Sequence, residues 1–145
     1  MRPEGFDGGA AEQWSLWVLD HGLPALPAGL GEGESVPVAW WTGPESAAVL
    51  HLRRWPPEDL RDPADPDDPH TEVDVHVFER ADDGWVLAAS GGSGGWPDPR
   101  LVRVPVPGEH ASLSGVVAGG WGERPHVALW GEVGEAAATL SLIHI

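Results

Sequence analysis

The stretch Thr71–Ser90, TEVDVHVFERADDGWVLAAS, decides the fold of this chain. Valines occupy every second position from 73 to 77 and alternate with Asp74, His76 and Phe78. A period of two places alternate side chains on opposite faces of a β-strand. Asp83-Gly84 supplies the positive φ angles of a tight turn, and WVLAAS follows as a partner strand. The stretch therefore predicts an antiparallel β-hairpin.

The predicted turn also fixes an expected register within this hairpin. A two-residue loop at Asp83-Gly84 would set Phe78 opposite Ala89 and place Arg80 diagonal to Trp85. An arginine over a tryptophan ring would add a cation–π contact of about 0.5–1 kcal/mol at an exposed site.

Upstream of this hairpin, the sequence predicts one helix and a second hairpin. Ala10–His21 has Ala10, Trp14, Trp17, Val18 and His21 at helical spacing, and Gly22 is a suitable stop. Val36–Trp41 and Ala47–Trp55 read as strands around the turn Thr42–Glu45. Pro37 cannot donate to a ladder, so we expect the first of these strands to start at a sheet edge.

Downstream, turn-rich and strand-like segments alternate. The Pro- and Asp-rich segment 56–70 predicts a surface loop, and within the turn-rich segment Gly91–Pro99 the residues Gly91–Gly95 predict a flexible turn. Three further strands are expected at Leu101–Val106, Ser112–Ala118 and His126–Val133.

These elements predict an α+β fold. We expect one N-terminal helix packed on an antiparallel β-sheet, followed by an incomplete β-sandwich-like C-terminal unit. The predicted boundaries are 1–106 for the helix and sheet, 107–139 for the start of the small β unit, and 140–145 for a non-native tail.

The expectation of a foreign tail comes from codon usage. The chain has no Lys, Asn, Tyr or Cys, and its only two Ile are Ile143 and Ile145. Residues with A/T-rich codons are therefore avoided elsewhere, which indicates a high-GC bacterial genome. Leu140–Ile145 is what CTG TCT CTT ATA CAC ATC encodes, and this resembles the transposase end used in sequencing libraries. We expect the natural sequence to diverge near Thr139, although a genuine apolar terminal strand would suit the same residue types.

Composition restricts the class of partner. The 23 acidic and 8 basic residues give a formal charge of −15, which disfavours nucleic acid and anionic membranes. No apolar run is long enough to cross a bilayer, and residues 1–9 lack a secretory pattern, so a cytoplasmic location is expected. The absence of Cys excludes disulfides and a thiolate nucleophile.

The nine Trp are the unusual feature, because the chain has only two Phe to help fill a core. We expect most Trp to be buried. Trp96, between Gly95 and Pro97, is the one most expected to be exposed, and Trp85 is a second candidate for ligand contact.

Two histidines on neighbouring predicted strands form the other candidate. His51 and His76 could act as an acid/base pair with Asp74, although surface histidines are common in β proteins. The loop carboxylates 62, 65, 67 and 68 lack calcium-loop spacing, and Ser90–Gly95 lacks a nucleophile-elbow pattern. We therefore expect no metal and no cofactor.

Two functions remain open at this point. The favoured one is a non-catalytic binding or interaction module that contacts a protein or a small-molecule ligand through one or two exposed Trp. The alternative is a small hydrolase or isomerase with a pocket between helix and sheet, using His51 or His76 with Asp74.

Overall fold

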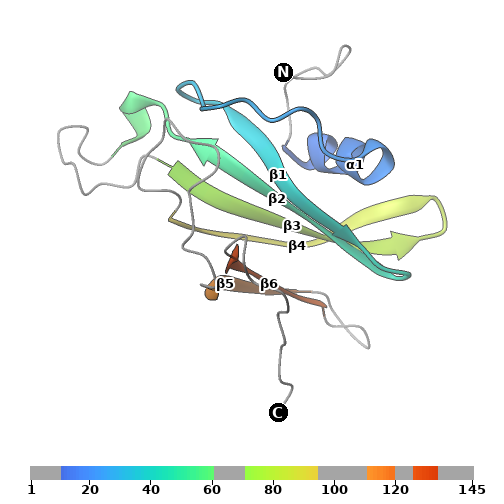
Figure 1. The fold of residues 1–145 in the computed structure, drawn as a ribbon. Helices are drawn as coiled ribbons and strands as arrows, with labels where there is room; N and C mark the ends of the chain where they lie inside the picture. Colours follow the sequence, from blue (N-terminus) through green and yellow to red (C-terminus); the bar gives the residue numbers. More distant parts are fainter. Residues whose placement is uncertain (1–10, 61–70, 95–110, 120–125, 134–145) are drawn as a thin grey trace.

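The computed structural model describes residues 11–60, 71–94, 111–119 and 126–133, with side chains placed within 11–60 and 71–92 (Figure 1). One helix and a four-stranded antiparallel sheet form its main body. The elements are α1 (Ala11–His21), β1 (Ser35–Thr42), β2 (Ser46–Arg54), a short 3₁₀ turn (Pro57–Asp59), β3 (Thr71–Ala81), β4 (Gly84–Gly94), β5 (Ala111–Gly119) and β6 (His126–Val133). The α+β prediction and both hairpins are confirmed.

Helix α1 ends at the glycine that the sequence indicated. Gly22 adopts a φ of 85°, and its N–H donates to the Val18 carbonyl over 2.7 Å. The buried face, however, consists of Trp14, Ser15, Val18 and Leu19. It is rotated from the predicted face, so that His21 is exposed and its ring stacks on Trp17.

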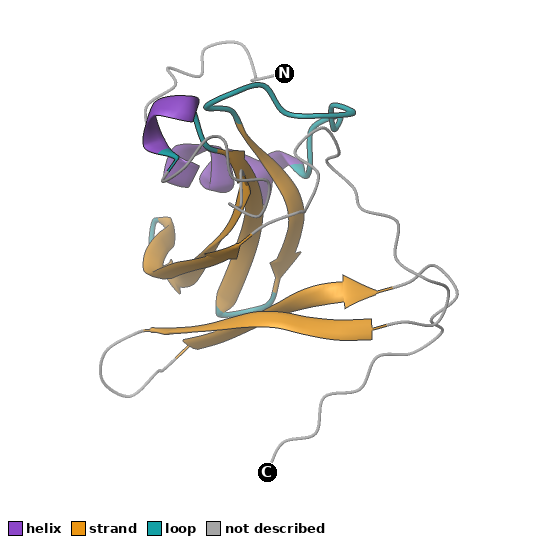
Figure 2. Ribbon diagram, turned by 90° about the vertical axis from the view of Figure 1, so that its left-hand side faces the viewer, coloured by secondary structure: helices purple, strands orange, loops and turns teal. Residues whose placement is uncertain are grey.

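The four strands follow in the order β1-β2-β3-β4, and α1 covers one face of this sheet (Figure 2). The helix side chains Trp14, Val18 and Leu19 form one core with Ala47, Val49 and Phe78. Burial of apolar surface contributes about 25 cal/mol per Å², and this free energy holds the helix against the sheet.

The opposite face of the sheet has a second core. Its buried members are Leu30, Val36, Leu52, Val73, Val75 and Val77. The valines predicted to lie on one face of the strand are thus all in the same core, as their period of two requires.

The β3–β4 register differs from the predicted one. The turn residues are Asp82 and Asp83, one position earlier than expected, and Arg80 pairs directly with Trp85. The earlier turn sets Phe78 opposite Leu87, not Ala89, and a bulge between Val77 and Phe78 then shifts the register once more, so that Val77 faces Ala89. The cation–π contact is confirmed, with the guanidinium carbon 4.1 Å from the ring centroid of Trp85.

Strand β4 also continues where a flexible turn was predicted. It remains paired with β3 as far as Gly94, so residues 91–94 belong to the sheet. At Gly92 an added Cβ would lie 2.7 Å from the Val73 carbonyl oxygen. Glycine here permits a close approach of two strands, which a sequence pattern of Gly and Ser does not distinguish from a loop.

Strands β5 and β6 form a separate two-stranded antiparallel sheet. This hairpin lies beside β4, on the side of the main sheet away from α1 (Figures 1 and 2). The two strands confirm the predicted segments, whereas the sandwich-like unit and the domain boundaries stay predictions. The predicted strand 101–106, most of the Asp-rich loop and the tail lie outside the described residues. In the part that is described, no helix is long and apolar enough to cross a membrane.

Candidate functional site

The structure joins three polar side chains between α1 and the sheet. The Ser15 hydroxyl oxygen lies 2.7 Å from His51 Nε2 and 2.8 Å from His76 Nδ1. The two imidazole rings are 5.2 Å apart between centroids, with 44° between their planes. We call these three residues the Ser–His cluster. Both histidines were predicted as candidates, whereas Ser15 was missed.

Strand register explains why the histidines meet. His51 on β2 pairs with Asp74 on β3, and Val49 pairs with His76. These two pairs are two positions apart along each strand, so His51 and His76 lie diagonally to each other on the same face of the sheet. This is the face that α1 covers. Ser15 is brought over them by the helix, one residue after the buried Trp14.

Burial keeps His51 uncharged. Its side chain has 0% exposure, and burial, followed by repulsion from His76, lowers its pKa to about 3. The ring edge of Trp14 approaches it at 6.3 Å between centroids, which adds to the apolar surroundings. His51 is therefore a neutral hydrogen-bonding group at physiological pH.

The hydrogen bonds indicate how the protons are arranged. A hydroxyl has one hydrogen, so at least one imidazole must donate to Ser15. His51 Nδ1 is buried and has no hydrogen-bond partner among the described residues. An unpaired buried N–H is the rarer defect, so we assign the His51 proton to Nε2, which donates to the Ser15 oxygen. The Ser15 hydroxyl can then donate to His76 Nδ1.

His76 has a more mixed environment than His51. Its side chain is half-buried, and burial lowers its pKa, while the carboxylates of Asp74 and Glu12 act in the opposite direction. Asp74 lies two residues before it on β3, and Glu12 lies in the first turn of α1. Only this end of the cluster therefore approaches solvent and charge.

A pair of carboxyl groups adjoins the cluster on the same face. Burial, repulsion from Asp74 and a hydrogen bond with Asp74 raise the pKa of Glu72, and Arg53 opposes the shift. An added Cβ at Gly92 would come within 2.9 Å of Asp74 Oδ1 and 3.0 Å of Glu72 Oε1. The bare glycine thus leaves space for this carboxyl pair above β4.

The chemistry open to these groups is limited by access. Ser15 and His51 both have 0% exposure, so the hydroxyl cannot meet a substrate carbonyl in this conformation. His76 and Asp74 are half-buried and could exchange protons with a ligand. Among the described residues, no group of three or more His, Asp or Glu is arranged to hold a metal ion.

Trp85 and Trp96 were the two Trp predicted to contact a ligand. Trp85 is half-buried beneath Arg80, where it packs against the core beside α1. Trp96 lies outside the described residues. Two Trp that were expected in the core are exposed instead: Trp40 at 41% and Trp41 at 57%.

These two Trp belong to β1, which is an edge strand. Adjacent strand residues point to opposite faces, so one ring lies on each side of the sheet edge. Trp40 pairs with Val49 on the face that α1 covers, and its Cζ2 atom is 3.9 Å from the position of an added Gly22 Cβ. Trp41 pairs with Ala48, which belongs to the other face. Pro37 gave the signal for an edge, but nothing in the sequence separated these two Trp from core residues.

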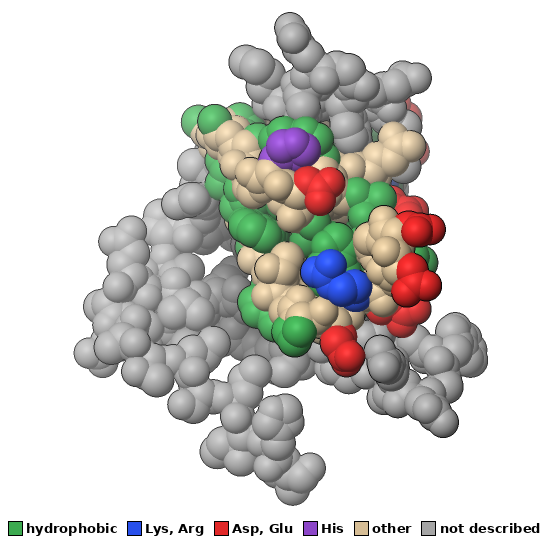
Figure 3. Space-filling view, turned by 90° about the vertical axis from the view of Figure 1, so that its right-hand side faces the viewer, with side chains coloured by type: hydrophobic (Ala, Val, Ile, Leu, Met, Phe, Trp, Pro, Cys, Tyr) green, Lys and Arg blue, Asp and Glu red, His purple; other side chains and the backbone are tan. Residues whose placement is uncertain are grey.

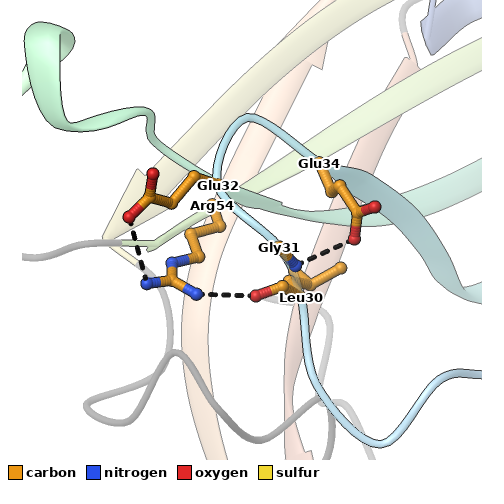
Figure 4. A network of polar contacts seen from close by, with 5 residues as sticks. All are labelled: Leu30, Gly31, Glu32, Glu34 and Arg54. Carbon is orange, nitrogen blue, oxygen red and sulfur yellow. Dashed lines mark hydrogen bonds and ion pairs between the residues drawn. The ribbon is translucent and has the colours of Figure 1, made fainter.

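The beginning of β1 is fixed by a polar network (Figure 4). Arg54 donates to the Leu30 carbonyl over 2.8 Å and lies 3.9 Å from a Glu32 carboxylate oxygen. The Gly31 N–H donates to the carboxylate of Glu34 over 2.8 Å. The segment entering the edge strand is thus tied to the end of β2.

The described surface is acidic and its cations are engaged. Twelve Asp and Glu accompany three Arg within 11–60 and 71–94. Arg53 and Arg80 lie over Trp rings, and Arg54 joins the network just described. In the view of Figure 3, acidic side chains occupy several separate places and basic atoms one. The described part of the chain therefore carries an excess of negative charge.

No protein-family model matches the chain, and neither the curated proteins nor the solved structures include one with significant similarity to it.

Proposed function

We propose that this protein is a non-catalytic binding module that holds a protein partner at Trp40 and Trp41. The observation that carries the proposal is the exposure of two adjacent Trp on one edge strand, at 41% and 57%. Large aromatic side chains at the centre of an interface supply much of its binding energy.

The rest of the main body supports an interaction role for these two side chains. Trp14 is buried, while Trp17, Trp55 and Trp85 are half-buried. Among the Trp side chains that the structure describes, these four thus serve in packing, whereas Trp40 and Trp41 are exposed on the edge strand. Exposed aromatic groups beside a free edge are typical of interaction sites and are costly to keep in water without one.

The Ser–His cluster supports a structural role for its buried members. Ser15 and His51 are fully buried and bonded to each other across the helix–sheet interface. A buried hydrogen-bonded set specifies how α1 sits on the sheet. Packing and hydrogen bonding therefore account for Ser15 and His51 without a catalytic role.

Selection from a displayed library of random peptides tests the proposal. Wild-type protein should enrich peptides that bind it. The double variant Trp40→Ala, Trp41→Ala should bind these peptides with a free energy that is weaker by about 2 kcal/mol or more. Val86→Ala is the matched control, because Val86 is also an exposed apolar residue, at 50%. Enrichment that is equal for the double variant, with folding of all variants verified, would refute the proposal.

A second candidate function is acid–base catalysis at His76. The observation that favours it is the half-buried row of Glu72, Asp74 and His76, which continues the Ser–His cluster along β3 and in which the pKa of Glu72 is raised and that of His76 lowered. Hydrolysis of activated esters by wild type and His76→Gln provides the test. A rate that depends on His76 but is indifferent to Trp40 and Trp41 would favour the enzyme.

A further inference from the structure

We infer that the partner binds as an extended, basic segment that adds a fifth strand to the sheet along Ala39–Thr42. This inference rests on the proposed function, and it names the binding mode and the charge of the partner. In this binding mode, backbone hydrogen bonds between the partner and β1 supply affinity, and the Trp side chains supply selectivity.

The outer edge of β1 is accessible along Ala39–Thr42. Strand β1 is the first strand in the order β1-β2-β3-β4, so among the described residues it has a neighbour on one side only. Ala39, Trp40, Trp41 and Thr42 are all exposed, whereas Val36 and Pro37 are buried. A register shift between Pro37 and Ala39 separates these two halves. Bulges and Pro protect edges from pairing, so the accessible part begins at Ala39.

The two Trp suit an added strand better than a globular surface. Because they lie on opposite faces of the edge, a strand paired with β1 would have one ring over each of its faces. Cross-strand pairs of an aromatic with a β-branched or long side chain stabilise such a pairing. A flat protein surface could cover only one of the two rings at a time.

The edge is also held in its extended form before binding. The polar network of Arg54 fixes the segment that enters β1, and the Gly43 N–H donates to the Ser46 carbonyl at the other end over 2.8 Å. Little ordering of the protein is then needed on association, which lowers the free-energy cost of binding.

Charge selects a basic segment. Trp40 lies beside the carboxyl end of α1, where the helix dipole is negative, and Asp20 is exposed in that last turn. A Lys or Arg of the partner could lie over the Trp40 ring as Arg80 lies over Trp85. A second copy of this chain is disfavoured, because each copy has a net charge of −15.

Defined synthetic peptides test the inference. The probes are short peptides that alternate Arg with Val or Thr, the same sequences with Glu for Arg, and the basic set with alternate backbone nitrogens methylated. Titration calorimetry with the full chain should show binding of the basic set only. Methylation on the paired edge should weaken it about tenfold or more, and Trp40→Ala, Trp41→Ala should do the same while Val86→Ala does not.

The outcomes separate this inference from the proposed function. If library peptides bind in a Trp-dependent manner but tolerate methylation of either edge, or are proline-rich or acidic, the added-strand inference is wrong and the binding module stands. If neither library nor defined peptides bind in a Trp-dependent manner, both fail. Concentration-dependent dimerisation that the Trp double variant abolishes would show a second copy as the occupant and would overturn the basic partner.

Discussion

Lowering the pH should destabilise the fold through His51, and the size of the effect follows from its burial. The folded pKa is about 3 against an ordinary value of 6.5. Between these values the unfolded state binds the proton that the folded state refuses, so stability falls as the pH falls through this window and is fully present above it. Between pH 7 and pH 5, His51 alone should remove about 2 kcal/mol of unfolding free energy.

Urea denaturation at the two pH values, for wild type and His51→Leu, isolates this term. The variant removes the buried imidazole and its unpaired Nδ1, so at pH 7 its stability should change by about 1 kcal/mol or less. The difference between wild type and variant should then shift by about 2 kcal/mol on going to pH 5. Comparing differences cancels, to a first approximation, the pH-dependent contributions of groups that do not interact with His51.

His21→Gln serves as the matched control, because it removes an exposed histidine from α1 and leaves the buried one in place. It should keep the full loss of stability at pH 5. If His51→Leu shows the same pH dependence as wild type, His51 is not buried neutral beneath α1, and the assignment of its proton to Nε2 fails with it.

Other substitutions probe the packing around the site. Ser15→Ala removes the shared partner of both histidines and should lower the unfolding free energy by about 1–3 kcal/mol, whereas Gln13→Ala on the exposed face of α1 should leave urea midpoints nearly unchanged. Gly92→Val should lower the unfolding free energy by more than about 1 kcal/mol, because its Cβ would meet a backbone oxygen of β3. Gly31→Ala should be tolerated as the control, because its Cβ would meet only a flexible side chain. Equal urea midpoints for the two variants would contradict the close approach of β3 and β4. Arg80→Ala should cost about 0.5–1 kcal/mol through loss of its ring contact; no change in thermal unfolding would show that the contact is not maintained in solution.

The sequence predicted the elements well because local rules decided them. Alternating valines fixed β3, and Gly22 fixed the end of α1. The β3–β4 register was predicted wrongly because the turn is at Asp82-Asp83 and not at Asp83-Gly84, and a bulge between Val77 and Phe78, which no turn rule anticipates, shifts it again. Residues 91–94 were misassigned for a related reason: glycine is flexible alone but is required in a strand where carboxyl groups of a neighbour need the space.

The candidate site was only half predictable. Register could bring His51 and His76 to one face, but the rotation of α1 placed Ser15 over them, and tertiary packing sets that rotation. Likewise, Pro37 indicated an edge strand, whereas the exposure of Trp40 and Trp41 depends on how far α1 and its connection reach along β1. Composition alone favoured a core role for both.

Solution NMR of the protein with a bound basic strand peptide tests the central claim most directly. The account predicts close contacts between the backbone of the peptide and that of Ala39–Thr42, together with slowed amide exchange along this segment. Contacts of the peptide with the row of His76 and Asp74 instead, with exchange at Ala39–Thr42 unchanged, would contradict it.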